Sequence, residues 1–135
     1  GITNNLGGGI TETDEVDYII EEAGTSANNT WNYRKWQSGT LECWARFYVN
    51  SMNISSTSGQ LRYATVTISD RTYPVAFVSN PIVNIDGNVT NGNGWCVMNN
   101  TNYSPTQMGG VYVYAPTSQT GVGVTVNVYA VGRWK

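Results

Sequence analysis

The alternation between Leu41 and Val49 constrains the fold of this chain more than any other stretch of its sequence. In an extended strand, one face of this stretch would carry apolar side chains only, namely Leu41, Cys43, Ala45, Phe47 and Val49. An aromatic-rich run at 31–36 comes before it, and the turn-forming sequence Gln-Ser-Gly-Thr at 37–40 separates the two runs. This pattern predicts a β-hairpin that places one apolar face against a core.

The opposite face of the same strand would carry Glu42, Trp44, Arg46 and Tyr48. A face that meets only water is usually built from smaller polar residues or lysine. Two large aromatic residues set between charges therefore indicate that something covers this face. We expect the cover to be another sheet, another chain or a ligand.

Alternating stretches recur at 61–68, 95–98, 111–114 and 122–131, with shorter strands expected at 18–20, 73–78 and 82–85. The stretch at 122–131 alternates most regularly, with valine at 122, 124, 126 and 128, and is expected to be central in its sheet. Gly, Asn or Pro residues separate the stretches, and none of them has a helical period. The predicted fold is all-β, an antiparallel β-sandwich or compact barrel of about nine or ten strands with essentially no helix.

The 135 residues suffice for one domain with a single core. We expect residues 1–11, which include three consecutive glycines, to be a flexible lead-in from a stalk, and residues 12–135 to form a single β-sandwich domain. Six of the nine carboxylates lie between Glu12 and Glu22 and predict a solvated first strand rather than a cation site. No apolar run is long enough to cross a bilayer and no signal peptide is recognisable, so membrane insertion is not expected.

The composition argues against several classes of function. The net charge is −2 and the seven Lys and Arg residues are scattered, so no nucleic-acid partner is expected. The chain has no histidine, which removes the commonest general base and leaves its serines and cysteines without one. Glu42 has no obvious carboxylate partner for glycoside hydrolysis. We therefore expect no enzyme activity.

No metal and no other cofactor is expected either. The polar stretch 86–94 is interpreted as a loop, and it resembles a calcium loop only superficially because Val97 stands where a bidentate glutamate would be needed. The two cysteines, Cys43 and Cys96, lie in predicted strands. They are interpreted as small buried hydrophobic residues, with a disulfide as the alternative.

Binding of a saccharide is better supported by the composition. Nine Tyr and five Trp stand among many Asn, Thr and Ser residues, and such aromatic rings and amides suit sugar rings and their hydroxyl groups, although the same rings also fill β-sheet cores. We expect the site at the polar segments 86–93 and 99–107, which flank Trp95 and hold no Lys or Arg. The candidate ligand-binding residues are Trp95, Asp86, Asn88, Asn91, Asn99, Asn100, Asn102 and Tyr103.

A family resemblance is carried by Tyr33-Arg34-Lys35-Trp36, Ser38-Gly39, Glu42-Cys43-Trp44 and the closing Gly132-Arg133-Trp134-Lys135. Together these motifs, which span residues 17–49 and the last strand, resemble the carboxy-terminal head domain of tail-fibre and receptor-binding proteins of tailed phages and prophages of Gram-positive bacteria. The motif residues are expected to hold the sheet and the subunit interface, and they name no ligand residue.

The resemblance implies a homotrimeric β-sandwich head at the tip of a virion fibre, preceded by a fibre stalk. Such a head would bind a bacterial cell-surface saccharide without catalysis, and it would be assembled in the host cytoplasm with unpaired cysteines. We expect the subunit interface at Glu42, Trp44, Arg46 and Tyr48. The alternative is a carbohydrate-binding module or adhesin domain of a secreted bacterial protein.

Overall fold

The computed structural model describes residues 16–135, so the expected lead-in at 1–11 and the acidic residues before 16 lie outside the described residues. The described chain forms two antiparallel sheets. The strands are β1 (Ile19–Ala23), β2 (Asn32–Trp36), β3 (Thr40–Ile54), β4 (Ser56–Ser58), β5 (Leu61–Val66), β6 (Ile82–Thr90), β7 (Trp95–Met98), β8 (Val111–Ala115) and β9 (Gln119–Arg133). Residues 16–135 contain no helix, and so none that could span a membrane. The all-β sandwich prediction is confirmed.

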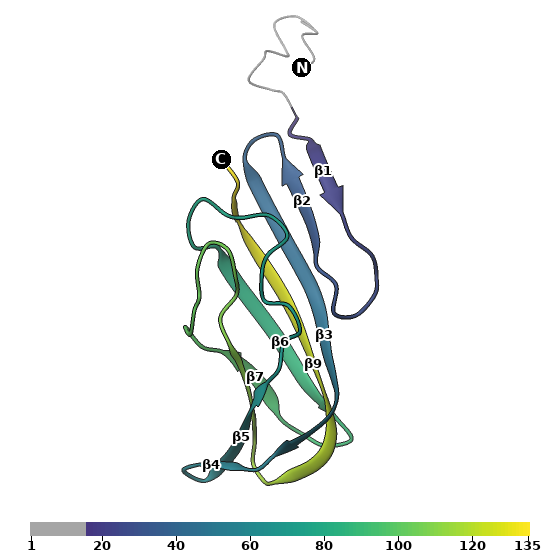
Figure 1. The fold of residues 1–135 in the computed structure, drawn as a ribbon, viewed down its shortest axis with the longest axis vertical. Coiled ribbons are helices and arrows are strands. Elements are labelled where there is room, and N and C mark those ends of the chain that lie inside the picture. The colour runs from purple at the N-terminus through teal and green to yellow at the C-terminus, as the bar shows by residue number, and fades with distance from the viewer. Residues whose placement is uncertain (1–15) are drawn as a thin grey trace, which may run out of the picture.

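The five-stranded sheet has the order β1-β2-β3-β9-β6, and the four-stranded sheet has the order β4-β5-β8-β7. The long strands β3 and β9 pair along the length of the molecule, and the chain enters and ends at the same end of it, opposite the β4–β5 turn (Figure 1). Strand β9 is flanked by β3 and β6, so the most regular stretch of the sequence lies inside its sheet as expected. The hairpin of β2 and β3 is also confirmed.

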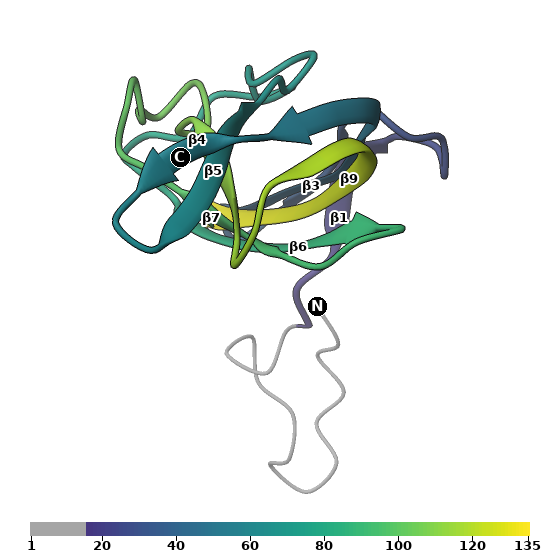
Figure 2. The same cartoon turned by 90° about the horizontal axis from the view of Figure 1, so that it is seen from below.

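The core lies between the sheets and is built from the alternating apolar faces. Every core-side residue predicted from 41 to 47 is buried, and Val124 and Val126 of β9 meet them with no exposed surface. Seen along the long axis, the two sheets lie one over the other (Figure 2). Cys43 and Cys96 are free thiols, and burial raises their pKa values to about 12 and about 11. The cysteines therefore act as apolar side chains.

The strand expected at 73–78 is wrong. Only Thr72 forms an isolated bridge, with Gln107, and the segment then crosses the end of the sandwich without a ladder. Tyr73 and Phe77 are both buried, with ring centroids 5.0 Å apart, because the segment is shaped to insert these two rings into the core. Pro74 between them cannot donate a ladder hydrogen bond.

The prediction of a loop at 86–94 is wrong for its first half, because strand β6 continues to Thr90. Its polar residues face solvent and Val89 is buried, so the segment keeps the alternation of a strand that has one solvated face. Gly87 is required in this strand, since a Cβ at that position would lie 2.5 Å from the Cβ of Cys96 on β7. The glycine therefore lets the edge strands of the two sheets touch.

Candidate functional site

The two parts of the sequence motif, which lie at opposite ends of the chain, form one structural unit. The Trp134 indole N–H donates to the carbonyl of Trp36 at 2.8 Å, and the Trp134 backbone N–H donates to the carbonyl of Gly39 at 2.9 Å. Arg133 donates to the carbonyl of Ser38 at 2.7 Å. The ammonium nitrogen of Lys35 lies 4.4 Å from the centre of the Trp134 ring, a cation–π distance. The carboxy terminus thus locks the hairpin turn.

The turn itself admits little substitution. Gly39 is buried with φ of +113°, a conformation that side chains rarely adopt, and a Cβ there would overlap the Arg133 guanidinium. On the other side of the turn, the Ser38 hydroxyl donates to the Asp17 carboxylate at 2.5 Å and the Ser38 N–H donates to it at 3.0 Å. The hydroxyl hydrogen bond lowers the pKa of Asp17. The turn therefore also fixes the place where the described chain begins.

Glu42 is the centre of a hydrogen-bond network on the outer face of the five-stranded sheet. The Trp36 indole donates to one carboxylate oxygen at 2.7 Å and the Tyr129 hydroxyl donates to the other at 2.5 Å. Partial burial by itself would raise the pKa of Glu42, but these two hydrogen bonds and the charge of Arg34 lower it overall. The same contact, added to burial, raises the pKa of Tyr129 to about 12. Glu42 is therefore a fixed anion with both oxygens engaged.

Arg34 links this network to the neighbouring aromatic ring and to the sheet edge. Its guanidinium carbon lies 5.1 Å from the centre of the Trp44 ring, and its Nε lies 3.3 Å from the Glu22 carboxylate on β1. A second, longer ion pair joins Arg34 to Glu42 at 3.9 Å. The Trp44 ring is thus held between cation and sheet in one orientation.

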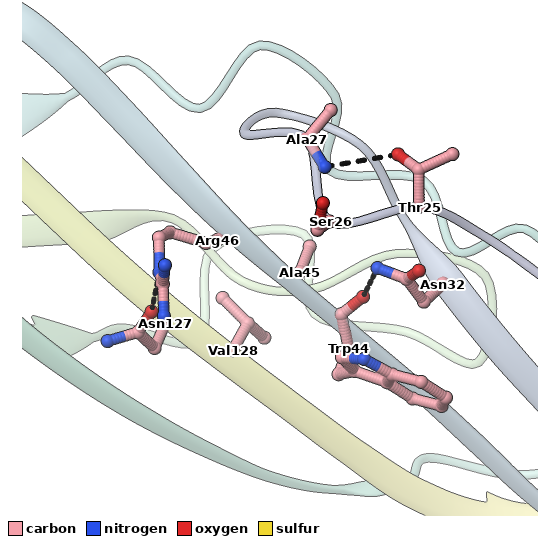
Figure 3. Close-up of a pocket in the computed structure, with 9 residues that line it drawn as sticks. All are labelled: Thr25, Ser26, Ala27, Asn32, Trp44, Ala45, Arg46, Asn127 and Val128. Atoms are coloured by element: carbon pink, nitrogen blue, oxygen red, sulfur yellow. Dashed lines mark hydrogen bonds between the residues drawn. The ribbon is translucent and has the colours of Figure 1, made fainter.

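A hollow of about 390 Å³ lies beside Trp44 on this outer face (Figure 3). Residues 25–27 of the loop between β1 and β2 form one wall, and Arg46 and Asn127 form the other. Arg46 donates from Nε to the Asn127 side-chain oxygen at 2.9 Å, and Asn32 donates to the carbonyl of Trp44 at 3.4 Å. The hollow is open, and Asn32, Arg46 and Asn127 in its lining already bond to the protein.

The residues predicted to form the subunit interface share this face, because each pairs with a β9 residue that points away from the core. We call this surface the motif face, defined by Glu42, Trp44, Arg46 and Tyr48. The four-stranded sheet packs on the opposite side of the five-stranded sheet. The motif face was expected to be covered by another sheet, another chain or a ligand. No second sheet of residues 16–135 covers it, so another chain or a ligand remains.

The structure does not bring the predicted ligand residues together in one groove. Asp86 and Asn88 stand opposite Asn127 and Thr125 of β9, so they belong to the outer side of the five-stranded sheet. Trp95 is in register with Tyr114 and lies on the outer face of the other sheet. Asn91 occupies the turn between the two, with φ of 62°. Because the β6–β7 connection passes from one sheet to the other, the segments flanking Trp95 point in different directions.

The second predicted segment, 99–107, is folded largely on itself. The Asn99 side chain accepts from the N–H of Thr101 at 2.8 Å, and the Asn102 carbonyl accepts from the side chain of Gln107 at 2.8 Å. The Tyr103 hydroxyl donates to the carbonyl of Pro81. Asn100 is exposed, and its carbonyl accepts from the N–H of Tyr103. These bonds shape the loop, and saccharide binding by its side chains stays a prediction.

Sequence reasoning missed three tyrosines that lie beside Trp95. Tyr63 of β5 is directly opposite Tyr114 of β8, which is directly opposite Trp95 of β7, and Tyr112 stands next to them. The sequence did place Tyr63 on the side of its strand away from Val66. It carried no signal that β5 pairs with β8, because that pairing joins segments far apart in the chain.

Among residues 16–135, no group of three or more Cys, Asp or Glu side chains is placed to hold a metal ion. The absence of a cofactor stays an expectation from the sequence.

The sequence matches no protein-family model and no curated protein. Two solved structures resemble it: the fibre of R1 pyocin from P. aeruginosa, comprising its C-terminal residues 323–701, and an N-truncated R1-type pyocin tail fibre. Each is 18% identical over 84% of this chain, with a TM-score of 0.44. The chain spans 28% of the length of the first structure and 86% of the second. These values are too low to assign the chain to a family or a function.

Proposed function

We propose that this chain is the head domain of a tail fibre, a non-catalytic homotrimer that attaches a phage or phage-like particle to a saccharide on the bacterial surface. The observation that carries the proposal is the union of the two motif segments. The residues that resemble fibre head domains occur at 33–44 and at 132–135, and they meet through the hydrogen bonds of Trp134 and Arg133. Because the two segments meet in space, they form one structural unit, which supports the resemblance. The motif resembles that of fibre proteins of phages of Gram-positive bacteria, so such a bacterium is the proposed host.

The motif face supports the proposed trimer. Tyr129 is 38% exposed and Ile82, at the far edge of the same side, is 68% exposed. The face also carries both signs of charge, with Glu42 and Arg46 on one strand. Aromatic rings and arginine are enriched in subunit interfaces, and an exposed aromatic sheet face is an aggregation risk for a monomer.

The absence of catalysis is supported by the state of Glu42. Two donors hold its oxygens, and its lowered pKa keeps it ionised at neutral pH, so it has no proton to donate as a general acid. A retaining glycosidase would need a second carboxylate close to it. The carboxylate of Glu22 instead bonds to Arg34 at the edge of the sheet.

Sedimentation of the whole chain at micromolar concentration tests the assembly. The parent is expected to sediment as a trimer, and Trp44→Arg, which adds a charge to the motif face, is expected to sediment as a folded monomer. Trp95→Ala is the matched control, because it removes a tryptophan from the other sheet. A monomeric parent would contradict the fibre head and favour a carbohydrate-binding module or adhesin. A trimeric Trp44→Arg variant would place the interface elsewhere.

Adsorption tests the attachment. Labelled parent chain is mixed with cells of a panel of Gram-positive bacteria, with and without wall polysaccharide extracted from the same cells as a competitor. Binding to some strains and its loss with the competitor are expected. If the parent adsorbs to no strain, or if the extracted polysaccharide never competes, the proposed attachment to a saccharide is wrong.

A further inference from the structure

We propose that the outer face of the four-stranded sheet binds an uncharged saccharide chain along a row of three aromatic rings, Trp95, Tyr114 and Tyr63, which we call the aromatic row. This inference rests on the proposed function and deepens it, since it assigns the saccharide to a surface and a chemical class. It moves the binding surface from the loops around Trp95 to the sheet on which Trp95 stands.

The three rings form one strip across three adjacent strands. The Trp95 and Tyr114 rings are 20° from parallel with centroids 6.3 Å apart, and the Tyr114 and Tyr63 rings are 31° from parallel with centroids 5.7 Å apart. Because the rings stand in register on neighbouring strands, the strip runs perpendicular to the strands and extends about 10 Å from first to last ring. Such a strip is longer than one sugar ring and is aligned in one direction, as an extended oligosaccharide requires.

Tyr112 lies beside the aromatic row, with its ring in a different orientation. Its ring is 62° from that of Tyr63 and 83° from that of Tyr114, with centroids 5.7 and 6.3 Å away. The Tyr112 ring is therefore steeply inclined to the rings of Tyr63 and Tyr114, whereas the rings of the row are more nearly parallel to one another. In the described part of the chain, the hydroxyl groups of these three tyrosines donate to no protein atom, so a ligand can bond to them without displacing an internal partner.

The chemistry of the surrounding face matches an uncharged ligand. Trp95 is 44% exposed and Val97, on the same strand and face, is 39% exposed. The remaining residues in register on this side are all neutral, and they are Ser56, Ser58, Leu61, Thr65 and Tyr112. Aromatic rings stack on the CH faces of sugars, and hydroxyl groups exchange hydrogen bonds with sugar hydroxyls. Among the described residues in register on this side there is no cation to offset the loss of water from an anionic polymer, and Arg62, on the other side of β5, donates to the carbonyl of Leu61.

The contrast with the motif face favours a ligand over a second chain at the aromatic row. The motif face carries charged side chains of the kind that give a protein–protein contact its direction, and bonds within the chain hold Glu42 and Arg46 in place. The residues in register at the aromatic row include no such charged anchors. An open site on a sheet face makes few desolvated contacts and binds weakly, so strong attachment would come from several copies on one particle.

Calorimetric titration of the whole chain tests the inference. The probes are chitin-derived, cello- and malto-oligosaccharides and the neutral wall polysaccharide of any strain to which the chain adsorbs, with the anionic wall polymer of that strain as the charged probe. The parent is expected to bind at least one neutral probe and not the charged one. Trp95→Ala and Tyr63→Ala, at the two ends of the row, are each expected to weaken that binding about tenfold. Tyr18→Ala, which removes an exposed tyrosine just before β1, is the control and is expected to bind like the parent.

The outcomes separate this inference from the proposed function. If the parent adsorbs to cells but both row variants bind and adsorb like the parent, the fibre head stands and the aromatic row is wrong. If the row variants become monomers, the row is a contact between chains and the inference is also overturned. If the parent adsorbs to no cells yet binds a neutral oligosaccharide through the row, the inference stands and the phage function fails. Should Tyr63→Ala not fold, Trp95→Ala at the exposed end decides alone.

Discussion

The two outer faces of the sandwich are both aromatic, yet they are built differently. On the motif face the charged groups are bonded within the chain: Glu42 accepts from Trp36 and Tyr129, and Arg46 donates to Asn127. On the opposite sheet, Tyr63 and Tyr114 contact other aromatic rings and are surrounded by neutral side chains. The first face therefore carries a network of charged side chains, and the second is an uncharged aromatic surface.

In the functions that we propose, the two faces serve two different tasks, subunit assembly and saccharide capture. A contact between subunits must keep one geometry, and a network of charge-assisted hydrogen bonds supplies that geometry. A surface that captures a polymer must bind and release units of similar shape, and stacking on flat rings tolerates this exchange. The core between the sheets keeps the two surfaces apart, so that each is expected to respond to its own substitutions.

The largest expected effect comes from a substitution at the place where the edge strands of the two sheets touch. Gly87→Ala would place a methyl group against Cys96, where the edge strands of the two sheets touch. We expect a loss of about 2–3 kcal/mol in the free energy of unfolding, because both neighbours are backbone or short side chain and cannot move away. Urea unfolding measures it. The double variant Gly87→Ala/Cys96→Gly is expected to recover part of the loss, and a single variant as stable as the parent would show that the sheets are not held in register here.

A matched pair of hydroxyl deletions compares the faces directly. Tyr129→Phe removes a donor to the Glu42 carboxylate and is expected to cost about 1–2 kcal/mol of unfolding free energy. Tyr114→Phe removes a hydroxyl without an internal partner and is expected to change the unfolding free energy by less than about 0.5 kcal/mol. Both are measured by urea unfolding at neutral pH. Equal losses would mean that the aromatic row is as much a structural network as the motif face.

Acid should weaken the motif face and the hairpin turn beside it. The pKa of Glu42 is lowered in the folded chain, so its contribution to stability is present above its ordinary value of 4.5 and is lost as the pH falls through the lower, folded value. Asp17, whose ordinary value is 3.8, acts in the same direction. Glu42→Gln is expected to flatten the decline of unfolding free energy with acid, as followed by thermal melts across this range. A variant that follows the parent curve would show that Glu42 does not titrate as a bonded carboxylate.

The smallest expected effect is at the rim of the motif face. The ion pair of Glu22 and Arg34 is solvent-exposed, with 57% and 35% of the side chains accessible. Glu22→Gln is therefore expected to lower the unfolding free energy by no more than about 0.5 kcal/mol, and less in high salt. Chemical unfolding at low and high ionic strength measures it. A larger cost would mean that Arg34 depends on Glu22 to hold Trp44.

The sequence predicted the features that depend on neighbours along the chain. Alternation from 41 to 49 gave the hairpin and its buried face, and the valines of 122–128 predicted a strand inside its sheet. Partners far apart in the chain were not predictable, so the register of Tyr63 with Tyr114 and Trp95 stayed hidden. The polar residues at 86–90 suggested a loop, but an edge strand with one solvated face accommodates the same residues.

The union of the hairpin turn with both ends of the described chain has a mechanical consequence. The described chain enters the sheet along β1, which is hydrogen-bonded to β2 (Figure 1). These hydrogen bonds lie across the direction of a pull on the amino end. The β1–β2 ladder would therefore be loaded in shear, with several bonds stressed at once. Ahead of that ladder, the Tyr18 carbonyl accepts from the N–H of Gln37 and Asp17 holds Ser38. The same hairpin turn is hydrogen-bonded to Arg133, the last residue of β9, and to Trp134, which follows it. A force applied at Asp17 would therefore be transmitted through the hairpin turn to the β3–β9 pair, the longest strand pair of the described chain.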